Sequence, residues 1–322
     1  MLKKILKPKI VALYHNYNDY KRFKKYAASD FKSDDKAHTR SKLMYYTHQI
    51  EKGLSRSDFR PDFGEIPISN LSNSMEAWVK VKGDSNDEFF LNALIVMRNY
   101  FLKHKELGVS TTREALFSKE LLALITEANV SESSSTIKIK EEDKVQNKFF
   151  NFSELAMKRY SVREYSDAPV DNNLIEEAIR IAQKSPSVCN RQSARVHIIE
   201  SCEMIEKILM IQGGFKGYQP PNKLAIITSD IRTFLKSNER TQSYIDGGLF
   251  AMSLMYALEF LSLASVALST MLSPKNEKRL REIARIGEYE NLIMIVAIGH
   301  FLKEVEVPAS PRNRVETVIT YK

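Results

Sequence analysis

A long apolar segment near the end of the chain most constrains what this sequence can fold into. Residues 244–261 are hydrophobic on nearly every side of a helix, and such a helix must be buried in a core or an interface. A short strand-like run follows at 266–268. Residues 292–298 have almost no polar side chain, as in a central strand that is buried on both faces. Helices and strands mixed in this order predict an α+β fold.

A change of pattern near residue 130 predicts two domains. Residues 1–128 read as mostly helical, because apolar residues recur at three- and four-residue spacing in 19–26, 37–52 and 88–106, with a long loop at 58–74. Residues 129–148 combine a serine run with dense charge and cannot bury much apolar surface, so we expect a linker there. The second domain is expected at 149–322, with further helices at 150–158, 172–184 and 202–211 and strands at 195–200 and 224–228.

The net charge of +8 is concentrated at the start of the chain. Residues 1–50 contain twelve Lys and Arg against four Asp, a net charge of +8, so the remainder balances to zero. Two readings stay open for this segment: a solvated basic helix face, or a peripheral contact with an anionic membrane or another polyanion. The sequence has no paired-Cys finger and no aromatic ribonucleoprotein signature, so we expect no nucleic-acid partner.

Cysteine usage and hydropathy favour a cytoplasmic protein. Cys189 and Cys202 are too few for a disulfide framework, and no metal-ligand spacing surrounds them, so we expect no metal site. No run reaches the roughly twenty apolar residues that a membrane span requires. The first residues are charged but lack a long apolar region and a cleavage site, so we expect no secretion signal.

A basic motif at 158–165, Lys-Arg-Tyr-Ser-Val-Arg-Glu-Tyr, indicates an anion site. Arg159 and Arg163 flank Ser161 at a spacing that places both guanidinium groups on one face of a helical turn. Guanidinium groups make paired charge-assisted hydrogen bonds to phosphate. A second segment at 185–192, Ser-Pro-Ser-Val-Cys-Asn-Arg-Gln, supplies short polar groups. Together they predict a site for a phosphorylated, planar cofactor, against the alternatives of a surface basic turn and ordinary helix termination.

These segments resemble two motifs of the nitroreductase family of flavin mononucleotide (FMN) oxidoreductases. The family motifs read Arg-(Arg/His)-Ser-x-(Arg/Lys)-x-(Phe/Tyr) and Pro-Ser-x-x-Asn-x-Gln-Pro-Trp. The resemblance covers about residues 150–322 and departs from the pattern where Ser193 and Ala194 stand in place of Pro-Trp. It implies a four- or five-stranded, mostly antiparallel sheet wrapped by helices, in an intertwined homodimer with FMN at the subunit interface.

The resemblance also implies the chemistry and the site residues. In this ping-pong reaction NADH or NADPH would pass hydride to the flavin N5 and leave before an unidentified small-molecule acceptor enters. The reductive step needs no catalytic side chain, so none is named. A scaffold or sensor that has lost turnover is the alternative. The implied FMN contacts are Arg159, Tyr160, Ser161 and Arg163 at the phosphate and ribityl chain; Pro186, Ser187, Val188 and Asn190 in a loop from the partner subunit; Ser269 and Thr270 near N5; and Arg312 and Arg314 closing over the phosphate.

One polar motif lies in the first domain. His48 and Glu51 share a helix face in the stretch Tyr-Thr-His-Gln-Ile-Glu-Lys-Gly-Leu at 46–54, and Gly53 suits a helix C-cap. Metal binding, acid–base work and a structural hydrogen bond stay open for this pair. A similar stretch precedes nitroreductase-like domains in some bacterial proteins, and this likeness implies a role in cell-envelope polysaccharide biosynthesis. No dinucleotide-binding, phosphate-loop or serine-hydrolase glycine motif occurs.

Overall fold

The computed structural model describes residues 2–28, 35–129 and 135–322. The chain divides into two compact units. The sheet unit comprises residues up to 17 together with 139–305, and the helical unit comprises 18–138 together with 306–322. Helix α1 (Leu2–Tyr26) spans the point of division.

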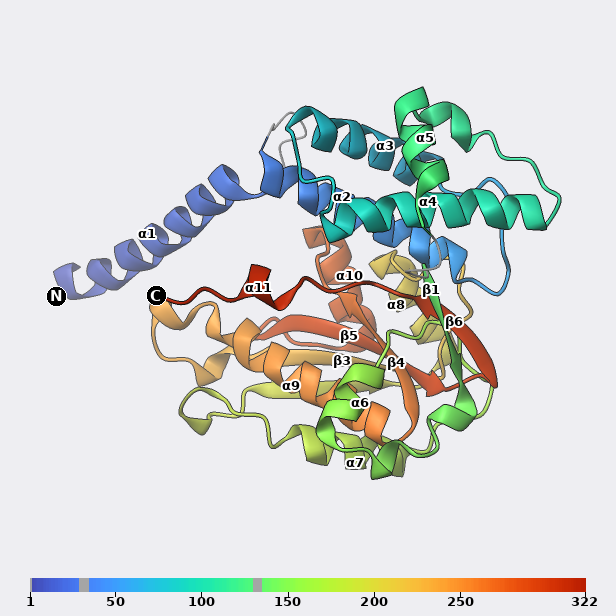
Figure 1. The fold of residues 1–322 in the computed structure, drawn as a ribbon. Coiled ribbons are helices and arrows are strands. Elements are labelled where there is room, and N and C mark those ends of the chain that lie inside the picture. The colour runs from blue at the N-terminus through green and yellow to red at the C-terminus, as the bar shows by residue number, and fades with distance from the viewer. Residues whose placement is uncertain (1, 29–34, 130–134) are drawn as a thin grey trace. The chain divides into compact units, whose positions relative to one another are not determined.

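The helical unit is built from helices that enclose one apolar core, and three of them begin at polar side-chain caps (Figure 1). Asp35, Asp87 and Ser118 each accept a hydrogen bond from a backbone N–H of the first turn that follows, which satisfies donors that the helix itself cannot. The largest fully buried side chains of this core include Leu43 and Tyr100. The helices are α2 (Lys36–Leu54), α3 (Glu65–Lys80), α4 (Glu88–Glu106), α5 (Lys119–Glu127) and the short α11 (Val315–Val318) in the C-terminal tail.

Two expectations for this region are wrong. The predicted loop at 58–74 ends early, because α3 begins at Glu65. Pro67 occupies the first turn, where no helical bond needs its missing N–H, and Ser72 and Ser74 donate to backbone carbonyl groups. Gly53 is not the C-cap, since α2 continues to Leu54. A β-carbon at residue 53 would lie 2.0 Å from the Phe63 ring, so close packing explains this glycine.

The sheet unit contains a four-stranded sheet with strand order β2-β3-β5-β4, and every adjacent pair is antiparallel. The predicted α+β fold is therefore confirmed, and the apolar run at 292–298 lies in a central strand as expected. A second sheet pairs β1 with β6. The strands are β1 (Thr136–Lys140), β2 (Ala194–Ile199), β3 (Lys223–Asp230), β4 (Leu263–Ser269), β5 (Glu290–His300) and β6 (Glu304–Pro308).

Both faces of the four-stranded sheet are covered by helices (Figure 1). Successive side chains of β3 alternate between the faces: Ala225 and Ile227 pack in the core with α7 and α9, whereas Leu224 and Ile226 pack in the core with α8 and α10. All eight residues of β3 are buried as a result. The helices of this unit are α6 (Phe152–Lys158), α7 (Asn172–Ala182), α8 (Cys202–Gln212), α9 (Gln242–Phe260) and α10 (Pro274–Ala284).

The predicted linker at 129–148 differs from the structure in its second half. Residues 130–134 lie outside the described residues, but 136–140 forms β1. Farther on, the buried Lys144 Nζ lies 2.5 Å from Glu259 Oε1 of α9, and Asn147 donates to the Glu259 carbonyl. Burial raises the pKa of Glu259, and the Lys144 charge opposes that rise. A charged stretch that looks solvated in sequence is thus anchored by a buried ion pair.

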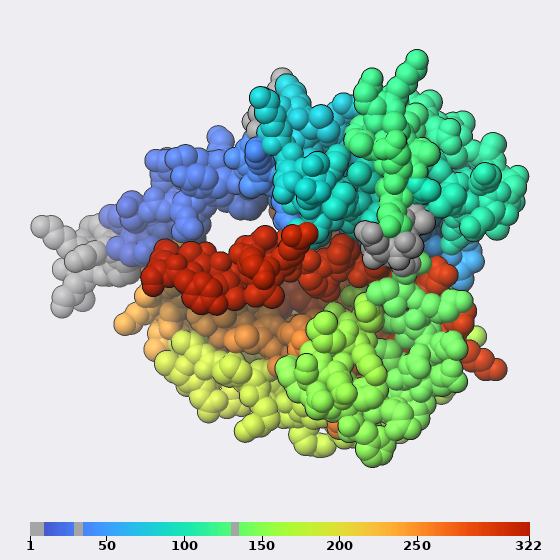
Figure 2. All heavy atoms as spheres, viewed as in Figure 1, coloured from blue at the N-terminus to red at the C-terminus, as the bar shows by residue number. Residues whose placement is uncertain are grey.

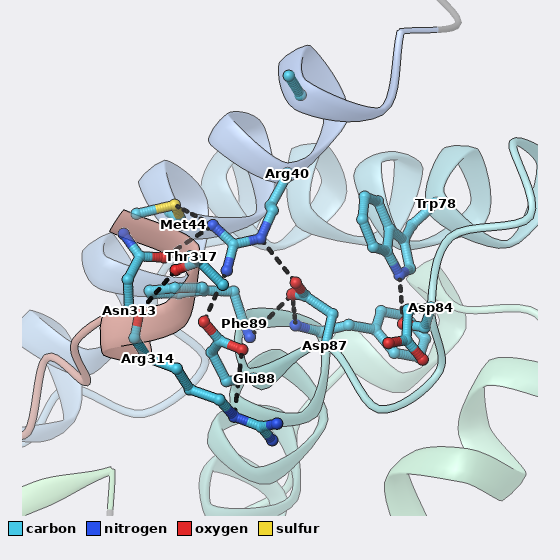
Figure 3. A network of polar contacts seen from close by, with 12 residues as sticks. Arg40, Met44, Trp78, Asp84, Asp87, Glu88, Phe89, Asn313, Arg314 and Thr317 are labelled. Carbon is cyan, nitrogen blue, oxygen red and sulfur yellow. Dashed lines mark hydrogen bonds and ion pairs between the residues drawn. The ribbon is translucent and has the colours of Figure 1, made fainter. Parts of the chain in front are cut away.

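The C-terminal tail was predicted to belong to the second domain, 149–322. In the structure, residues 306–322 belong to the helical unit instead. Figure 3 shows the network that holds this tail. The Arg40 guanidinium donates to Asp87 Oδ2 at 2.6 Å, Glu88 Oε1 at 2.8 Å and Asn313 Oδ1 at 2.9 Å. Arg314 adds a longer contact of 3.8 Å between its Nε and Glu88 Oε2. The tail is therefore bound through polar contacts to Arg40 of α2 and to the acidic start of α4.

Candidate functional site

The segment carrying Arg159, Ser161 and Arg163 is extended, so the predicted helical turn is wrong. Helix α6 ends at Lys158, and Arg159 has φ −75° and ψ 123°. The Val162 N–H then donates to the Ser265 carbonyl of β4 at 3.0 Å. An edge strand presents unpaired backbone groups, and this segment satisfies one of them. Residues two apart in an extended chain lie on the same side, so the three polar residues still share a side, opposite the buried Val162.

Arg163 is a partly buried cation that has no acidic partner among the described residues. Burial lowers the pKa of its guanidinium. Its side-chain hydrogen bond goes to the Ser161 carbonyl at 3.4 Å, and no carboxylate in the described part of the chain forms an ion pair with it. The segment itself is fixed by Tyr165, whose hydroxyl donates to the Val162 carbonyl at 2.7 Å. A buried, uncompensated positive charge is unfavourable, and an anionic ligand would offset that cost.

The neighbouring candidates also have free polar groups. Tyr160 and Ser161 are partly exposed, and within the described ranges their side chains have no hydrogen-bond partner. The same holds for the Arg159 side chain. Burial raises the pKa of Glu259, and the Arg159 charge limits that rise after the contacts with Lys144 and Asn147. The structure therefore brings the residues of the first motif together with their donors available.

The loop at 186–192 has an unusual backbone. Cys189, Asn190 and Gln192 have φ values of 49°, 53° and 49°, in the left-handed region that non-glycine residues rarely adopt. Each residue in this conformation raises the free energy of the folded state by on the order of 1 kcal/mol or more, so surrounding contacts must hold it in place. Backbone strain of this kind is often found at ligand sites. One of these contacts is local, since the Gln192 N–H donates to Ser187 Oγ at 2.9 Å.

Two side chains that the sequence analysis did not select hold this loop. The buried Asp246 of α9 accepts the Val188 N–H at 3.2 Å and the Gln242 amide at 2.8 Å. Arg191 donates to Glu239 Oε1 at 2.6 Å, and this contact, followed by the backbone N–H of Leu235, lowers the pKa of Glu239 to about 2. An aspartate inside an apolar helix was the signal that could have identified Asp246.

A pocket of about 340 Å³ lies beside this loop. Pro186 and Ser187 line it, whereas Val188 and Asn190 do not. Ala194 lines it too, where the family motif has Trp. Its neighbour Ser193 is fully buried and accepts a hydrogen bond from Ser229 Oγ of β3 at 2.8 Å. The Ser193 side chain therefore stabilises the sheet. The remaining lining residues are Ile179, Gln183, Ser185, Gln192, Arg195, Val196, Asp246 and Phe250.

The two motifs lie at diagonal corners of the four-stranded sheet. The first runs along the free edge of β4, and the second leads into β2 at the opposite edge. Three strand spacings, about 14 Å, separate these edges. Along the strands, Ser265 is level with Lys223 whereas Ala194 is level with Ser229, six residues and about 20 Å away. One chain therefore does not bring the two motifs to the same point.

The other predicted contacts belong to other elements of the chain. Ser269 is exposed at the end of β4, and its carbonyl accepts from the Gln212 amide at 3.2 Å. The Thr270 hydroxyl is engaged with the backbone of β5. Arg312 and Arg314 belong to the helical unit: Arg312 donates to the Ser310 carbonyl, and Arg314 pairs with Glu88.

The geometry around His48 and Glu51 favours a structural role. Glu51 is buried, with Oε2 3.3 Å from His48 Nδ1 and Oε1 accepting from the Asn92 amide at 3.1 Å. Ser310 Oγ approaches the same His48 nitrogen at 3.4 Å, so the three groups do not form a relay through both ring nitrogens. Across residues 2–28, 35–129 and 135–322, no cluster of three or more His, Cys, Asp or Glu side chains is arranged to hold a metal ion.

Comparison with known proteins identifies the class to which the sheet unit is similar. Residues 156–213, which include both motifs, match the model of the nitroreductase family. A relative from Archaeoglobus fulgidus with the provisional name NADH dehydrogenase/NAD(P)H nitroreductase is 26% identical over 142 residues, which is 44% of this chain and 80% of that protein. The resemblance to the nitroreductase family is therefore confirmed. These matches support an oxidoreductase of the nitroreductase type, with the helical unit as an addition.

Solved structures give similar alignments of about half the chain. A protein of Parabacteroides distasonis with the same provisional name is 19% identical with a TM-score of 0.47, and the match covers 53% of this chain and 97% of that one. A nitroreductase family protein of Clostridium difficile 630 is 26% identical with a TM-score of 0.45, and the match covers 54% of this chain and 99% of that one.

Proposed function

We propose that the protein is an FMN-dependent oxidoreductase that takes hydride from NADH or NADPH and reduces an acceptor still to be identified. The observation that carries this proposal is Arg163, a partly buried guanidinium with no carboxylate partner in the part of the chain that the structure describes. Arg159 and Ser161 lie on the same side of the segment. A phosphate monoester with a charge of roughly −1.5 to −2 would supply the missing negative charge and strong acceptor oxygens.

The residues present fit the cofactor that the family resemblance implies. Arg159, Ser161 and Arg163 would hold the phosphate and ribityl chain, and the strained loop at 186–192 would cover the ring system. FMN, when bound, would supply the redox chemistry, whereas the protein would supply binding, orientation and exclusion of water. Ala194 leaves the pocket wider than the family's Trp would, which favours a bulky acceptor over a small one.

We further propose that the active form is a homodimer with composite sites. The diagonal placement of the two motifs supports this arrangement, because a second copy related by a two-fold axis can bring its loop to the first chain's arginines. Each of the two sites would then take Arg159 and Arg163 from one subunit and the loop held by Asp246 from the other.

Flavin binding is the first test. The purified full-length protein should be yellow and should release FMN on denaturation. Arg159→Ala combined with Arg163→Ala should give a folded, colourless protein, because the phosphate loses both cationic partners. The matched control replaces the exposed Arg180 and Arg279 by Ala, which removes the same charge from α7 and α10. Retention of stoichiometric FMN by the Arg159/Arg163 variant would contradict the phosphate assignment.

Co-expression tests the composite site. Chains with Asp246→Ala and chains with both arginines replaced should each bind FMN poorly as homodimers. In a mixed dimer, one site collects all the substitutions and the other collects none, so one FMN per dimer should return. A mixed dimer that stays colourless would argue that each chain builds its own site.

Turnover separates an enzyme from a non-catalytic flavin-fold scaffold or sensor. Anaerobic addition of NADH or NADPH to the flavin-loaded protein should bleach the visible flavin absorbance, and an added quinone or nitroaromatic acceptor should restore it. A flavin band that neither nicotinamide changes would favour the scaffold.

A further inference from the structure

Helix α1 presents an exposed apolar stripe. Ile10, Leu13, Tyr17 and Tyr20 follow one another at spacings of three and four residues, so they lie on one side of the helix. Each is between 60% and 69% exposed. Figure 2 shows this part of α1 in blue at the surface of the molecule. Contiguous exposed apolar surface of this kind on a protein marks a site of interaction with a partner or a membrane.

The same helix is strongly basic. Between residues 2 and 26 it has eight Lys and Arg against one Asp, a net charge of +7, so α1 carries nearly all of the net charge of the protein. Its last turn contains Lys24 and Lys25, and its first turn has no acidic residue. The partner of α1 must therefore accept positive charge and bury apolar side chains at the same time.

These properties select one kind of partner among three. A second copy of α1 would bring another +7 against the first, and such like-charge contacts are unfavourable. A nucleic acid would neutralise the charge but leave the Leu13 and Tyr17 side chains in water. An anionic bilayer satisfies both requirements, because its headgroups attract Lys and Arg while the boundary with the acyl chains buries aliphatic and aromatic side chains.

We propose that α1 docks the protein on anionic membrane surfaces, with the stripe formed by Ile10, Leu13, Tyr17 and Tyr20 facing the acyl chains. The helix lies in the plane of the surface. It does not cross the bilayer, since none of the described helices is long and apolar enough to do so. The proposal is independent of the flavin site, because α1 contributes no residue to it. An acceptor that is itself dissolved in the membrane would become accessible to an enzyme held there.

Vesicle sedimentation of the full-length protein tests the proposal. Wild type should pellet with vesicles of equal parts phosphatidylglycerol and phosphatidylcholine and remain in solution with pure phosphatidylcholine. Combined replacement of Leu13, Tyr17 and Tyr20 by Glu should weaken partitioning at least about tenfold. The matched control places three Glu at the exposed Ile66, Val79 and Leu107 and should bind like wild type.

The charge requirement needs its own variant. Replacing Lys21, Arg22, Lys24 and Lys25 by Gln should weaken binding on the order of a hundredfold or more, with the wild-type affinity falling as salt rises. Circular dichroism should show that every variant is folded.

Four results would overturn the proposal. The first is equal binding to neutral and anionic vesicles, and the second is normal vesicle binding by the triple-Glu variant. The third is an absence of vesicle binding together with an α1-dependent dimer in size-exclusion chromatography, which would mean that a second copy covers the stripe. The fourth, full competition by duplex DNA with no effect of the triple-Glu change, would instead identify a polyanion site.

Discussion

The ring of Tyr165 lies so close to Gly299 that a β-carbon at residue 299 would stand 2.6 Å from the ring's Cγ. Gly299 is in β5, and Tyr165 is the last residue of the basic motif. Its hydroxyl donates to the Val162 carbonyl within the motif at 2.7 Å and also lies 3.4 Å from the Ala297 carbonyl oxygen of β5, so Tyr165 links the motif to the sheet. The glycine is therefore a condition for the placement of Arg163, although it is far from the motif in the sequence.

Gly299→Ala should destabilise the protein by about 1–3 kcal/mol, because the added methyl group displaces a well-packed ring. It should also weaken FMN binding, since displacement of Tyr165 loosens the segment that carries Arg163. Denaturant unfolding and flavin titration measure the two effects. Gly248→Ala is the control: beyond the adjoining backbone of its own helix α9, an added β-carbon there meets no atom within 4 Å, so stability should be unchanged or slightly higher. Equal effects of the two changes would refute this account of Tyr165.

The sequence predicted the central elements of the sheet unit well. The 292–298 strand and the 244–261 helix are apolar on nearly every side, and such segments have few alternatives to burial between layers. The α4 helix was also predicted at its observed bounds from the helical spacing of its apolar residues, and in the structure Asp87 caps its start. In these segments the local pattern and the tertiary packing favour the same structure.

Prediction was poorer where distant residues decide the structure. The basic motif was expected to be helical, but the free edge of β4 offers Val162 a backbone partner that no local pattern reveals. Lys144 looked solvated because its partner Glu259 is distant in sequence. The roles of Asp246 and Gly299 were missed for the same reason: each acts through a contact with a residue from another element.

Arg40 contacts both the start of α4 and the C-terminal tail. We expect Arg40→Ala to destabilise the helical unit by about 1–3 kcal/mol, since it removes the short ion pairs of the partly buried carboxylates of Asp87 and Glu88. The tail should then be cleaved faster in limited proteolysis. Arg314→Ala is the matched control, because its contact with Glu88 is long and 66% of its side chain is exposed. Its stability effect should be between about 0 and 1 kcal/mol.

The outcome for Arg314 also bears on the flavin. If Arg314→Ala leaves stability unchanged but weakens FMN binding, the family role predicted for the tail is supported. If FMN affinity is unchanged while the Arg40 variant alone releases the tail, the tail serves the helical unit and its arginines are not phosphate ligands.

The Arg191–Glu239 pair should make the loop at 186–192 sensitive to acid. The Arg191 hydrogen bonds, followed by the Leu235 N–H, lower the pKa of Glu239 from 4.5 to about 2 in the folded protein. A depressed folded-state pKa contributes stability that is present above pH 4.5 and is lost as the pH falls through about 2. The stability difference between wild type and Glu239→Gln should therefore shrink across this window. Unfolding curves at several pH values measure it, and a difference that stays constant would show that the pair does not hold the loop.

For the buried pair of Lys144 and Glu259, the pH dependence of folding stability should have the opposite sign. Burial raises the pKa of Glu259 above its ordinary value of 4.5, and Lys144 limits that rise. With Lys144→Met the carboxyl group keeps its burial but loses its cation, so its pKa should rise further. A raised folded-state pKa favours the folded protein at low pH and penalises it as the pH increases through the unfolded value. The variant should therefore lose about 3–5 kcal/mol at neutral pH and less below pH 4.5.

Adding Glu259→Gln to Lys144→Met supplies the control for this buried pair. The amide fills the same space without an ionisable group, so the double variant should recover part of the lost stability at neutral pH. Its stability relative to wild type should also vary less with pH than that of Lys144→Met alone. The measurement is a double-mutant cycle by denaturant unfolding at neutral pH and near pH 4. A Lys144→Met loss that is identical at both pH values would mean that Glu259 is already protonated in the folded protein, and that the contact with Lys144 is an ordinary hydrogen bond.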